Sequence, residues 1–389
     1  MEGRNLEGRK MDVAQVDQSP TITFVVTGRN DDHGGNQLKR AQLFVNSLMG
    51  QVERHRIDAE LVFVEWNPVP NQKKLYESLQ WPHSSCHVRV VEVSNRVHQR
   101  YEHSDGLQLF QMIAKNVGIR RAKGRFVLAT NLDVILSDEL AAFLASRLDP
   151  LCFYRVDRYD VNEHVPLDTS LDERLKYCKE NVIRVNRRSG TYEYDWFFCH
   201  GLGRAKRAAS RVSRLLRAIY AGMTPRRIRR AYRNLREGRT PYGPRRFVKY
   251  VRSVIAGIWL PYPRLFTNAC GDFTLLSREK WWALRGYPEL PIFSFHLDSV
   301  FLHMAYQSGL KEAVLDREAR LYHIEHSSGW TPAGEQKMYT TLRETGVPFL
   351  TFAEFRKLAA QMQKARRPLI LNGEDWGLSE EKLKELDVR

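Results

Sequence analysis

A carboxylate at the end of a short apolar run is the clearest chemical feature of this chain. Phe126–Ala129 leads directly into Thr130-Asn131-Leu132-Asp133. A run this short, preceded by Lys123-Gly124, predicts a strand buried on both faces, as in a parallel sheet. Asp133 then lies at the carboxyl end of the strand, where open α/β sheets bind ligands, so its carboxylate can hold a divalent metal and through it a phosphate. The alternative is that Asp133 only caps the turn before Ser137, itself the better-placed helix cap.

Strands and helices alternate around this run. Apolar runs predict strands at 21–26, 60–64 and 88–93, and helical periodicity predicts helices at 37–48 and 107–121. Strands separated by helices predict a parallel sheet. The first loop has no GxGxxG and the chain no GxxxxGK[ST], which argues against a Rossmann domain and a P-loop. Polar side chains near the strand ends suit a nucleotide; the expected contacts are Thr27, Arg29, Asn30, Asp31, Asn95 and Asn131.

Composition indicates a globular protein. The chain has 389 residues, 43% of them hydrophobic, which allows a substantial core. No apolar run approaches the roughly 18 residues that span a bilayer, and residues 1–20 lack the apolar core of a signal peptide, so we expect a disordered N-terminal tail there. Five scattered cysteines without a CxxC pair indicate reduced thiols, a cytoplasmic location and no zinc site.

Positive charge is concentrated in one segment. Residues 201–252 contain 17 basic residues against a single acid, Glu237, a net +16 that equals the formal charge of the whole chain. Apolar residues at helical spacing predict a basic α-helical insertion at 201–260. We expect it to bind an anionic membrane surface, through Arg226, Arg227, Arg229 and Arg230 among others. The alternatives are a solvated insertion packed on the body and, least favoured because no nucleic-acid module is present, a nucleic-acid interface.

The order of the motifs resembles the nucleotide-binding half of GT-A fold glycosyltransferases, the family-2-like inverting enzymes in particular. The motifs are Arg29-Asn30-Asp31, Glu65, the helix at 114–124 and Asn131-Leu132-Asp133. The resemblance implies that the bound nucleotide carries a sugar, and that Asn116 and Arg120 of this helix also contact it. Residues 268–282 and 286–289 are similar to the acceptor-side signature of such enzymes. The resemblance covers about 21–160 and 262–345, and implies a mixed, mainly parallel sheet flanked by helices.

The resemblance also implies a division of the chain. We expect a nucleotide-sugar-binding half at 21–160, a connecting segment at 161–200, the basic insertion at 201–260, an acceptor and catalytic half at 261–345, and a helical tail at 346–389. The family's metal motif is usually Asp-x-Asp, whereas Asn131 offers only a neutral carbonyl oxygen. His323 and His326 are the candidates to complete a Mn²⁺ or Mg²⁺ site with Asp133. Alternatively, both histidines only form hydrogen bonds at a strand end.

An inverting transfer needs a general base for the acceptor hydroxyl. By analogy with the family we expect this base to be Asp298, with Asp272 and Glu289 as alternatives, although Asp298 also suits a helix cap. The family implies that Glu65 holds the ribose or the base of the nucleotide. Three tryptophans are candidates to stack on the acceptor sugar, the first two being equally suited to the core: Trp281, Trp282 and Trp330.

These features together predict a metal-dependent, hexosyltransferase-like enzyme that moves a sugar from a nucleotide diphospho-sugar to an acceptor hydroxyl. The insertion suggests a lipid-linked or surface-polysaccharide acceptor in bacteria, and a protein peripheral to the inner face of the cell membrane. One alternative is a sugar nucleotidyltransferase, whose GxGTR-like opening is absent from residues 26–30. The other is a non-enzymatic, basic nucleic-acid-binding protein, which would leave the polar strand ends unexplained.

Overall fold

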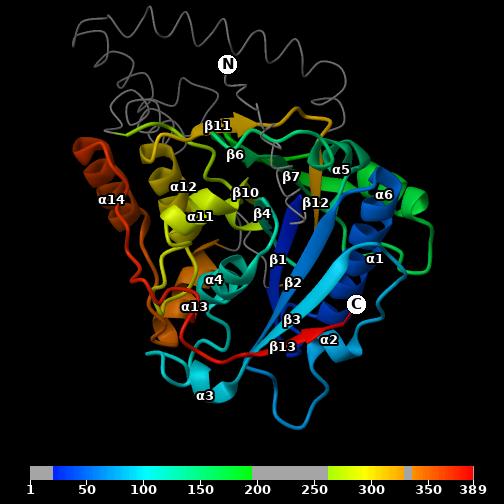
Figure 1. Cartoon of the computed structure of the whole chain (residues 1–389), viewed down its shortest axis with the longest axis horizontal. Helices are drawn as coiled ribbons and strands as arrows, with labels where there is room; N and C mark the ends of the chain where they lie inside the picture. The colour runs from blue at the N-terminus through cyan, green and yellow to red at the C-terminus, as the bar shows by residue number, and fades with distance from the viewer. Residues whose placement is uncertain (1–20, 195–261, 328–334, 389) are drawn as a thin grey trace, which may run out of the picture.

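An eight-stranded sheet forms the body of the protein in the computed structural model, which describes residues 21–194, 262–327 and 335–388 (Figure 1). Its centre consists of four parallel strands in the order β4-β1-β2-β3. They are β1 (Ile22–Gly28), β2 (Ala59–Trp66), β3 (His87–Val93) and β4 (Phe126–Ala129). All four strands are those that the apolar runs predict.

Further strands extend this sheet at both edges. Beyond β4 lie β10 (Thr274–Ser277), β6 (Cys152–Arg155) and β11 (Lys311–Val314), with β10 antiparallel to both of its neighbours. At the other edge β13 (Lys384–Asp387) runs antiparallel to β3. The sheet is therefore mixed and mainly parallel, and the predicted fold class is confirmed. The region 346–389, expected to be a helical tail, ends in this strand.

Helices cover both faces of the main sheet and give two hydrophobic cores (Figure 1). One core contains residues of α1 (Gln37–His55), α2 (Leu75–Ser78) and α5 (Asp138–Leu144). The other contains residues of α4 (Gln111–Arg121), α11 (Arg278–Ala283), α12 (Leu297–Gln307) and α14 (Phe352–Ala365). Strand β1 serves both cores, because successive side chains of a strand point to opposite faces.

A second, five-stranded sheet lies beside the first, in the order β5-β12-β7-β8-β9. Its strands are β5 (Val134–Leu136), β12 (Arg320–Ile324), β7 (Asp157–Val161), β8 (Val182–Arg187) and β9 (Gly190–Glu193). The segment 161–200, expected only to connect two halves, thus contributes strands and the helix α6 (Leu171–Glu180). Strand β12 pairs with both β5 and β7, which aligns His323 with Val134 on one side and with Asp160 on the other.

The remaining described elements are α3 (Asn95–His98), a 3-10 turn at Cys270–Asp272 and α13 (Glu335–Glu344). None of the helices that the structure describes is long and apolar enough to cross a membrane. The predicted tail at 1–20 and most of the predicted basic insertion, with Arg226, Arg227, Arg229 and Arg230, lie outside the described residues, as does Trp330.

Candidate active site

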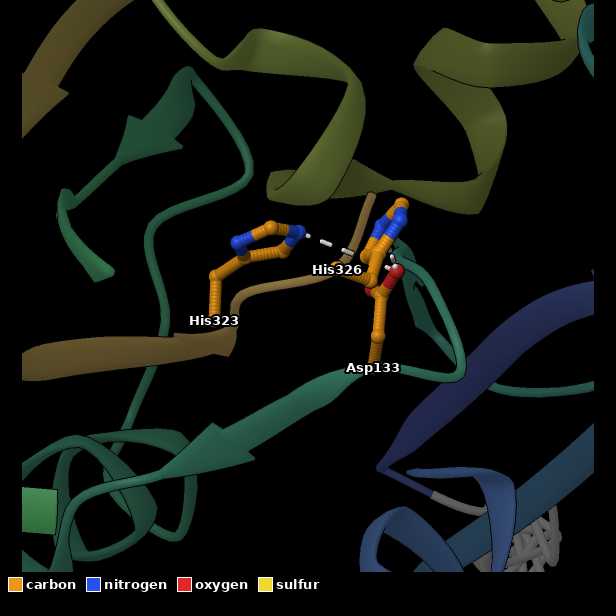
Figure 2. Close-up of side chains that lie close together, drawn as sticks. All are labelled: Asp133, His323 and His326. Carbon is orange, nitrogen blue, oxygen red and sulfur yellow. Dashed lines mark ion pairs between the residues drawn. The ribbon is translucent and has the colours of Figure 1, made fainter. Parts of the chain in front are cut away.

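Asp133, His323 and His326 come together at the carboxyl end of β4 (Figure 2). Asp133 follows β4 and immediately precedes β5, while His323 lies in β12 and His326 just after it. A hydrogen bond from the Ile324 amide to the Asp133 carbonyl, 2.8 Å long, fixes the two segments to each other. The carboxylate oxygen Oδ2 of Asp133 lies 3.2 Å from Nε2 of His326 and 3.7 Å from Nε2 of His323. The structure thus brings together the three residues expected to bind a metal.

The donor set fits a divalent ion. Oδ1 of Asp133 is buried and accepts no hydrogen bond in the described structure, so its lone pairs are available to coordinate a metal ion. Burial works against the charged form of Asp133, but the nearby charge of His323 and the hydrogen bond from His326 outweigh it and hold the pKa of the carboxyl below its usual value. Asp133 is therefore a carboxylate at neutral pH. One carboxylate and two imidazoles form the set that open transition-metal sites use, which favours Mn²⁺ over Mg²⁺.

A second group that shares His323 also contains acidic side chains, Asp160 and Glu325. Its charges are already compensated. Asp160 is fully buried and lies 2.9 Å from Nε of Arg158 and 2.7 Å from Nε of Arg184. Arg184 also reaches Glu325, at 2.5 Å. Because both carboxylates are paired with arginine, the second group has no charge left for a cation, and the Asp133 group is the better metal site.

Asp160 contacts the metal-site histidine from behind. Its Oδ1 lies 3.3 Å from Nδ1 of His323, while the other ring nitrogen, Nε2, faces Asp133. In neutral His323, a carboxylate at Nδ1 favours the tautomer with its proton on that nitrogen, which would leave the lone pair of Nε2 for a metal bound at Asp133. Asp160 thus lies where it would orient His323 as a metal ligand, and no local motif in the sequence marks it for that role.

Asp272 and Asn131 are bonded to each other. The amide of Asn131 donates to Oδ1 of Asp272 at 2.5 Å, and Arg158 reaches Oδ2 of the same carboxylate at 2.5 Å. The carbonyl oxygen of Asn131 in turn accepts a bond from Gln111. Asn131 therefore positions Asp272 beside the metal site, and both oxygens of Asp272 are occupied, which makes it a less suitable base than Asp298.

Asp298 lies in the first turn of α12, where its Oδ1 accepts the backbone amide of Ser299 at 2.7 Å. Its Oδ2 points toward Gly271, where an added Cβ would come within 3.0 Å. The fully buried Lys115 donates to the Gly271 carbonyl at 2.6 Å. Burial lowers the pKa of Lys115 to about 8, although Asp272 and Asp298 attract its charge. Lys115, Asp298 and the metal site thus form one electrostatically coupled region.

The residues expected to hold the nucleotide are largely engaged with the protein itself. Both oxygens of the buried Glu65 accept backbone amides, those of Leu75 and Tyr76, and burial raises the pKa of Glu65 to about 7. Arg29 donates to the Asn67 carbonyl and pairs with Asp31. The remaining three bond to neighbouring segments: Thr27 to the Val64 carbonyl, Asn30 to the Lys73 carbonyl and Asn95 to the Asn67 side chain. They shape the loops at the strand ends, and their contact with a nucleotide remains a prediction.

The remaining expected residues, in α4 and α11, also contact the protein itself. The buried Asn116 donates to Glu289 and bonds the backbone of Tyr287, which fixes the segment after α11 to α4. Trp281 is completely buried and stacks on Phe301 with ring centroids 4.2 Å apart, so it offers no surface to a saccharide. Two predicted contacts meet at the surface instead: Arg120 lies over the ring of Trp282, 4.5 Å from its centroid.

His33, in the loop after β1, and Arg40, near the start of α1, join the site. The ring of His33 meets that of His326 edge-on at 5.8 Å. The buried Arg40 donates to the carbonyls of His33 and Gly35, which holds this loop, and its charge also lowers the pKa of Asp133. The only sequence signal for either residue was the Gly34-Gly35 pair between them.

Comparisons with known proteins give weak matches. No protein-family model matches the chain, and neither does any curated protein sequence. The solved structures that it resembles include GalNAc-T7 with UDP, GalNAc and Mn²⁺, at 14% identity and a TM-score of 0.39 over 94% of this chain and 57% of that one. Another is the mannosyltransferase PcManGT from Pyrobaculum calidifontis in complex with GDP-Man and Mn²⁺, at 13% identity and a TM-score of 0.38 over 93% of this chain and 75% of the other. Both of these structures hold Mn²⁺ together with a nucleotide or a nucleotide sugar.

Proposed function

We propose that this protein is a divalent-metal-dependent glycosyltransferase that moves a sugar from a nucleotide diphospho-sugar to an acceptor hydroxyl. The observation that carries the proposal is the Asp133, His323 and His326 group at the carboxyl end of the parallel strands. That edge is where α/β sheets bind nucleotides, and the three side chains meet there from distant parts of the sequence. Oδ1 of the Asp133 carboxylate is buried and accepts no hydrogen bond among the described residues, which leaves it available to a metal ion.

The donor side of the reaction requires positive charge. Breaking the anomeric C–O bond leaves a nucleoside diphosphate, and a bound divalent ion supplies charge that stabilises this leaving group. Asp133, His323 and His326 would hold that ion. Arg40 adds a permanent positive charge from the start of α1, and the loop between β1 and α1 places His33 beside His326.

The acceptor side requires a base. Asp298 has one carboxylate oxygen bonded to the start of α12 and the other directed at Gly271, whose lack of a Cβ leaves room for that oxygen. Oδ2 of Asp298 would take the proton of the acceptor hydroxyl while the hydroxyl oxygen attacks the anomeric carbon. The Lys115 ammonium, near Asp272 and Asp298, balances the negative charge of these carboxylates.

The acceptor and the location are proposed from the sequence. The net +16 of residues 201–252 supports a lipid-linked or surface-polysaccharide saccharide in bacteria, reached at the inner face of the cell membrane by a cytoplasmic enzyme. The metal site favours this function over a non-enzymatic nucleic-acid-binding protein. The reaction products distinguish a glycosyltransferase from a sugar nucleotidyltransferase, because only the glycosyltransferase releases a nucleoside diphosphate.

The proposal is tested by thermal unfolding with nucleoside diphosphates, with and without Mn²⁺. A ligand that binds only the folded state at 100 times its Kd stabilises it by about 2.7 kcal/mol. We expect one nucleotide to raise the Tm of the wild type only when Mn²⁺ is present, and Asp133→Asn to lose the rise. Asp157→Asn is the matched control, because Asp157 is a buried aspartate paired with Arg187 and outside the metal group. A rise that is equal without Mn²⁺, or unchanged in Asp133→Asn, would reject the proposal.

A further inference from the structure

A cavity of about 800 Å³ lies at the opposite end of the main sheet from Asp133. It opens where β1 and β4 begin and where β10 ends, since Phe126 and Ser277 pair across the two strands at this edge. The four residues of β4, at about 3.3 Å each, separate it from the metal site. The lining residues that matter here are Thr21, Arg125, Arg147, Ser277, Arg278 and Trp282.

The three arginines of this cavity have no carboxylate partner among the described residues. Arg278 donates to the carbonyl of Lys123 at 2.9 Å, and Arg125 donates to the hydroxyl of Thr21 at 3.2 Å. Arg147 forms no ion pair in the described part of the chain. The one acid of the lining, Glu279, has a side chain 82% exposed and pairs with Lys280. Elsewhere along the sheets arginines pair with acids, as Arg89 does with Glu60.

The cavity wall also contains an unsatisfied polar group. Ser277 is 5% exposed, and its hydroxyl is buried without a hydrogen-bond partner in the described structure. Although Ser277 precedes α11, its hydroxyl makes no capping bond to that helix. A buried hydroxyl without a partner is unfavourable and is seldom kept without a reason.

We propose that this cavity binds a small anion that carries a phosphate group. Guanidinium groups match phosphate oxygens with paired N–H donors, and here backbone carbonyls and a threonine hold two of them in place without neutralising them. The volume lies within the range of small-molecule sites and exceeds what one inorganic phosphate fills. The site uses none of the metal-site residues, so it does not depend on the proposed transfer reaction.

Calorimetric titration with inorganic pyrophosphate in EDTA tests the proposal, because the chelator removes metal-dependent binding at Asp133. We expect the triple variant Arg125→Gln, Arg147→Gln, Arg278→Gln to bind at least ten times more weakly than the wild type. The matched control removes the same charge from exposed positions outside the cavity and outside the basic segment, as Arg317→Gln, Arg343→Gln, Arg367→Gln, and should change the affinity less than two-fold. Equal weakening by both variants, or no binding by the wild type, overturns the proposal.

A single substitution guards against misfolding of the triple variant. Arg147 is exposed and has no side-chain partner in the described structure, so Arg147→Glu should keep the wild-type Tm while it weakens pyrophosphate binding. Unchanged affinity in a folded Arg147→Glu variant contradicts the proposal. A parallel titration with a soluble short-chain phosphatidate identifies the source of the phosphate: tighter binding than pyrophosphate assigns a lipid headgroup, and weaker binding assigns a soluble phosphate.

Discussion

Asp160 is not one of the three expected metal ligands, yet we expect the substitution Asp160→Asn to weaken metal binding. The side chain of Asp160 is completely buried and has four partners: Arg158, Arg184, Asn186 and His323. Burial opposes its ionisation, but Arg158 and the other partners hold the pKa of its carboxyl below the usual value, so it is charged at neutral pH. The carboxylate fixes the proton of His323 on Nδ1, whereas an amide whose NH₂ faces Nδ1 selects the other tautomer.

The size of the effect follows from the geometry. With its proton on Nε2, His323 has no lone pair to offer beside Asp133, although the ring stays 3.7 Å from that carboxylate. Loss of a partner behind a ligating histidine typically costs 10–100-fold in metal affinity, or about 1.4–2.8 kcal/mol. We expect Asp160→Asn to fall in this range for Mn²⁺, with a smaller loss in Asp157→Asn, which removes a buried aspartate of the same strand that pairs with Arg187.

The assay is the electron paramagnetic resonance signal of free Mn²⁺, titrated against each folded variant at pH 7.5. Folding is checked by thermal unfolding, because the loss of Asp160 also leaves Arg158 and Arg184 less compensated. A folded Asp160→Asn variant that binds Mn²⁺ as tightly as Asp157→Asn would refute the orienting role of Asp160. A shift of the pH midpoint of Mn²⁺ binding, absent from the control, would identify the change as one in the histidine rather than in the fold.

Three further predictions concern the base, a buried acid and the basic segment. Asp298→Asn should lower kcat by about 10²–10⁴ while Mn²⁺ and donor affinities stay at the wild-type level, and a kcat within a few-fold of the wild type excludes Asp298 as the base. Burial raises the pKa of Glu289 from 4.5 to about 7, so between these pH values the folded state keeps a proton that the unfolded state loses. The free energy of unfolding contributed by Glu289 therefore falls as pH rises from 4.5 to 7, by at most about 3 kcal/mol. In urea unfolding, the free energy of unfolding of Glu289→Gln should rise relative to that of the wild type between pH 5 and pH 8, whereas the exposed control Glu279→Gln should keep a constant difference from the wild type. A difference between Glu289→Gln and the wild type that is equal at both pH values contradicts the raised pKa of Glu289. Replacing Arg226, Arg227, Arg229 and Arg230 with glutamine should weaken salt-sensitive co-sedimentation with anionic vesicles, and wild-type binding to neutral vesicles as strong as to anionic ones argues against a membrane role.

The central sheet was predictable because its signals are local. Strands β1 to β4 are short apolar runs bounded by polar or glycine residues, and such runs are readable without knowledge of their partners. Helix boundaries were less accurate: the helix expected at 37–48 extends to His55, and the one expected from residue 107 begins at Gln111. The predicted cap at Ser137 is confirmed, since its hydroxyl accepts the amide of Leu140.

The second sheet and the surroundings of the site were not predictable in this way. Strand β12 reaches Asp133 only because it pairs with β5 and β7, and that pairing depends on contacts between distant segments. A lysine in helix α4 would be expected on the solvent-exposed face, yet tertiary packing buries Lys115 completely. Trp281 and Trp282 are adjacent in sequence, but one fills the core and the other lies 44% exposed at the far cavity. In each case the role of the residue depends on its neighbours in space, and these neighbours are distant in the sequence.

The most direct test of the account is the position of a bound metal. Crystals grown with Mn²⁺ and a nucleoside diphosphate, measured at the manganese absorption edge, should show one anomalous peak in contact with Asp133, His323 and His326, with the diphosphate beside it. The same crystals of Asp133→Asn should lack that peak. A peak at Asp160 and Glu325 instead, or a diphosphate bound at the wild-type position without any metal peak, would contradict the account.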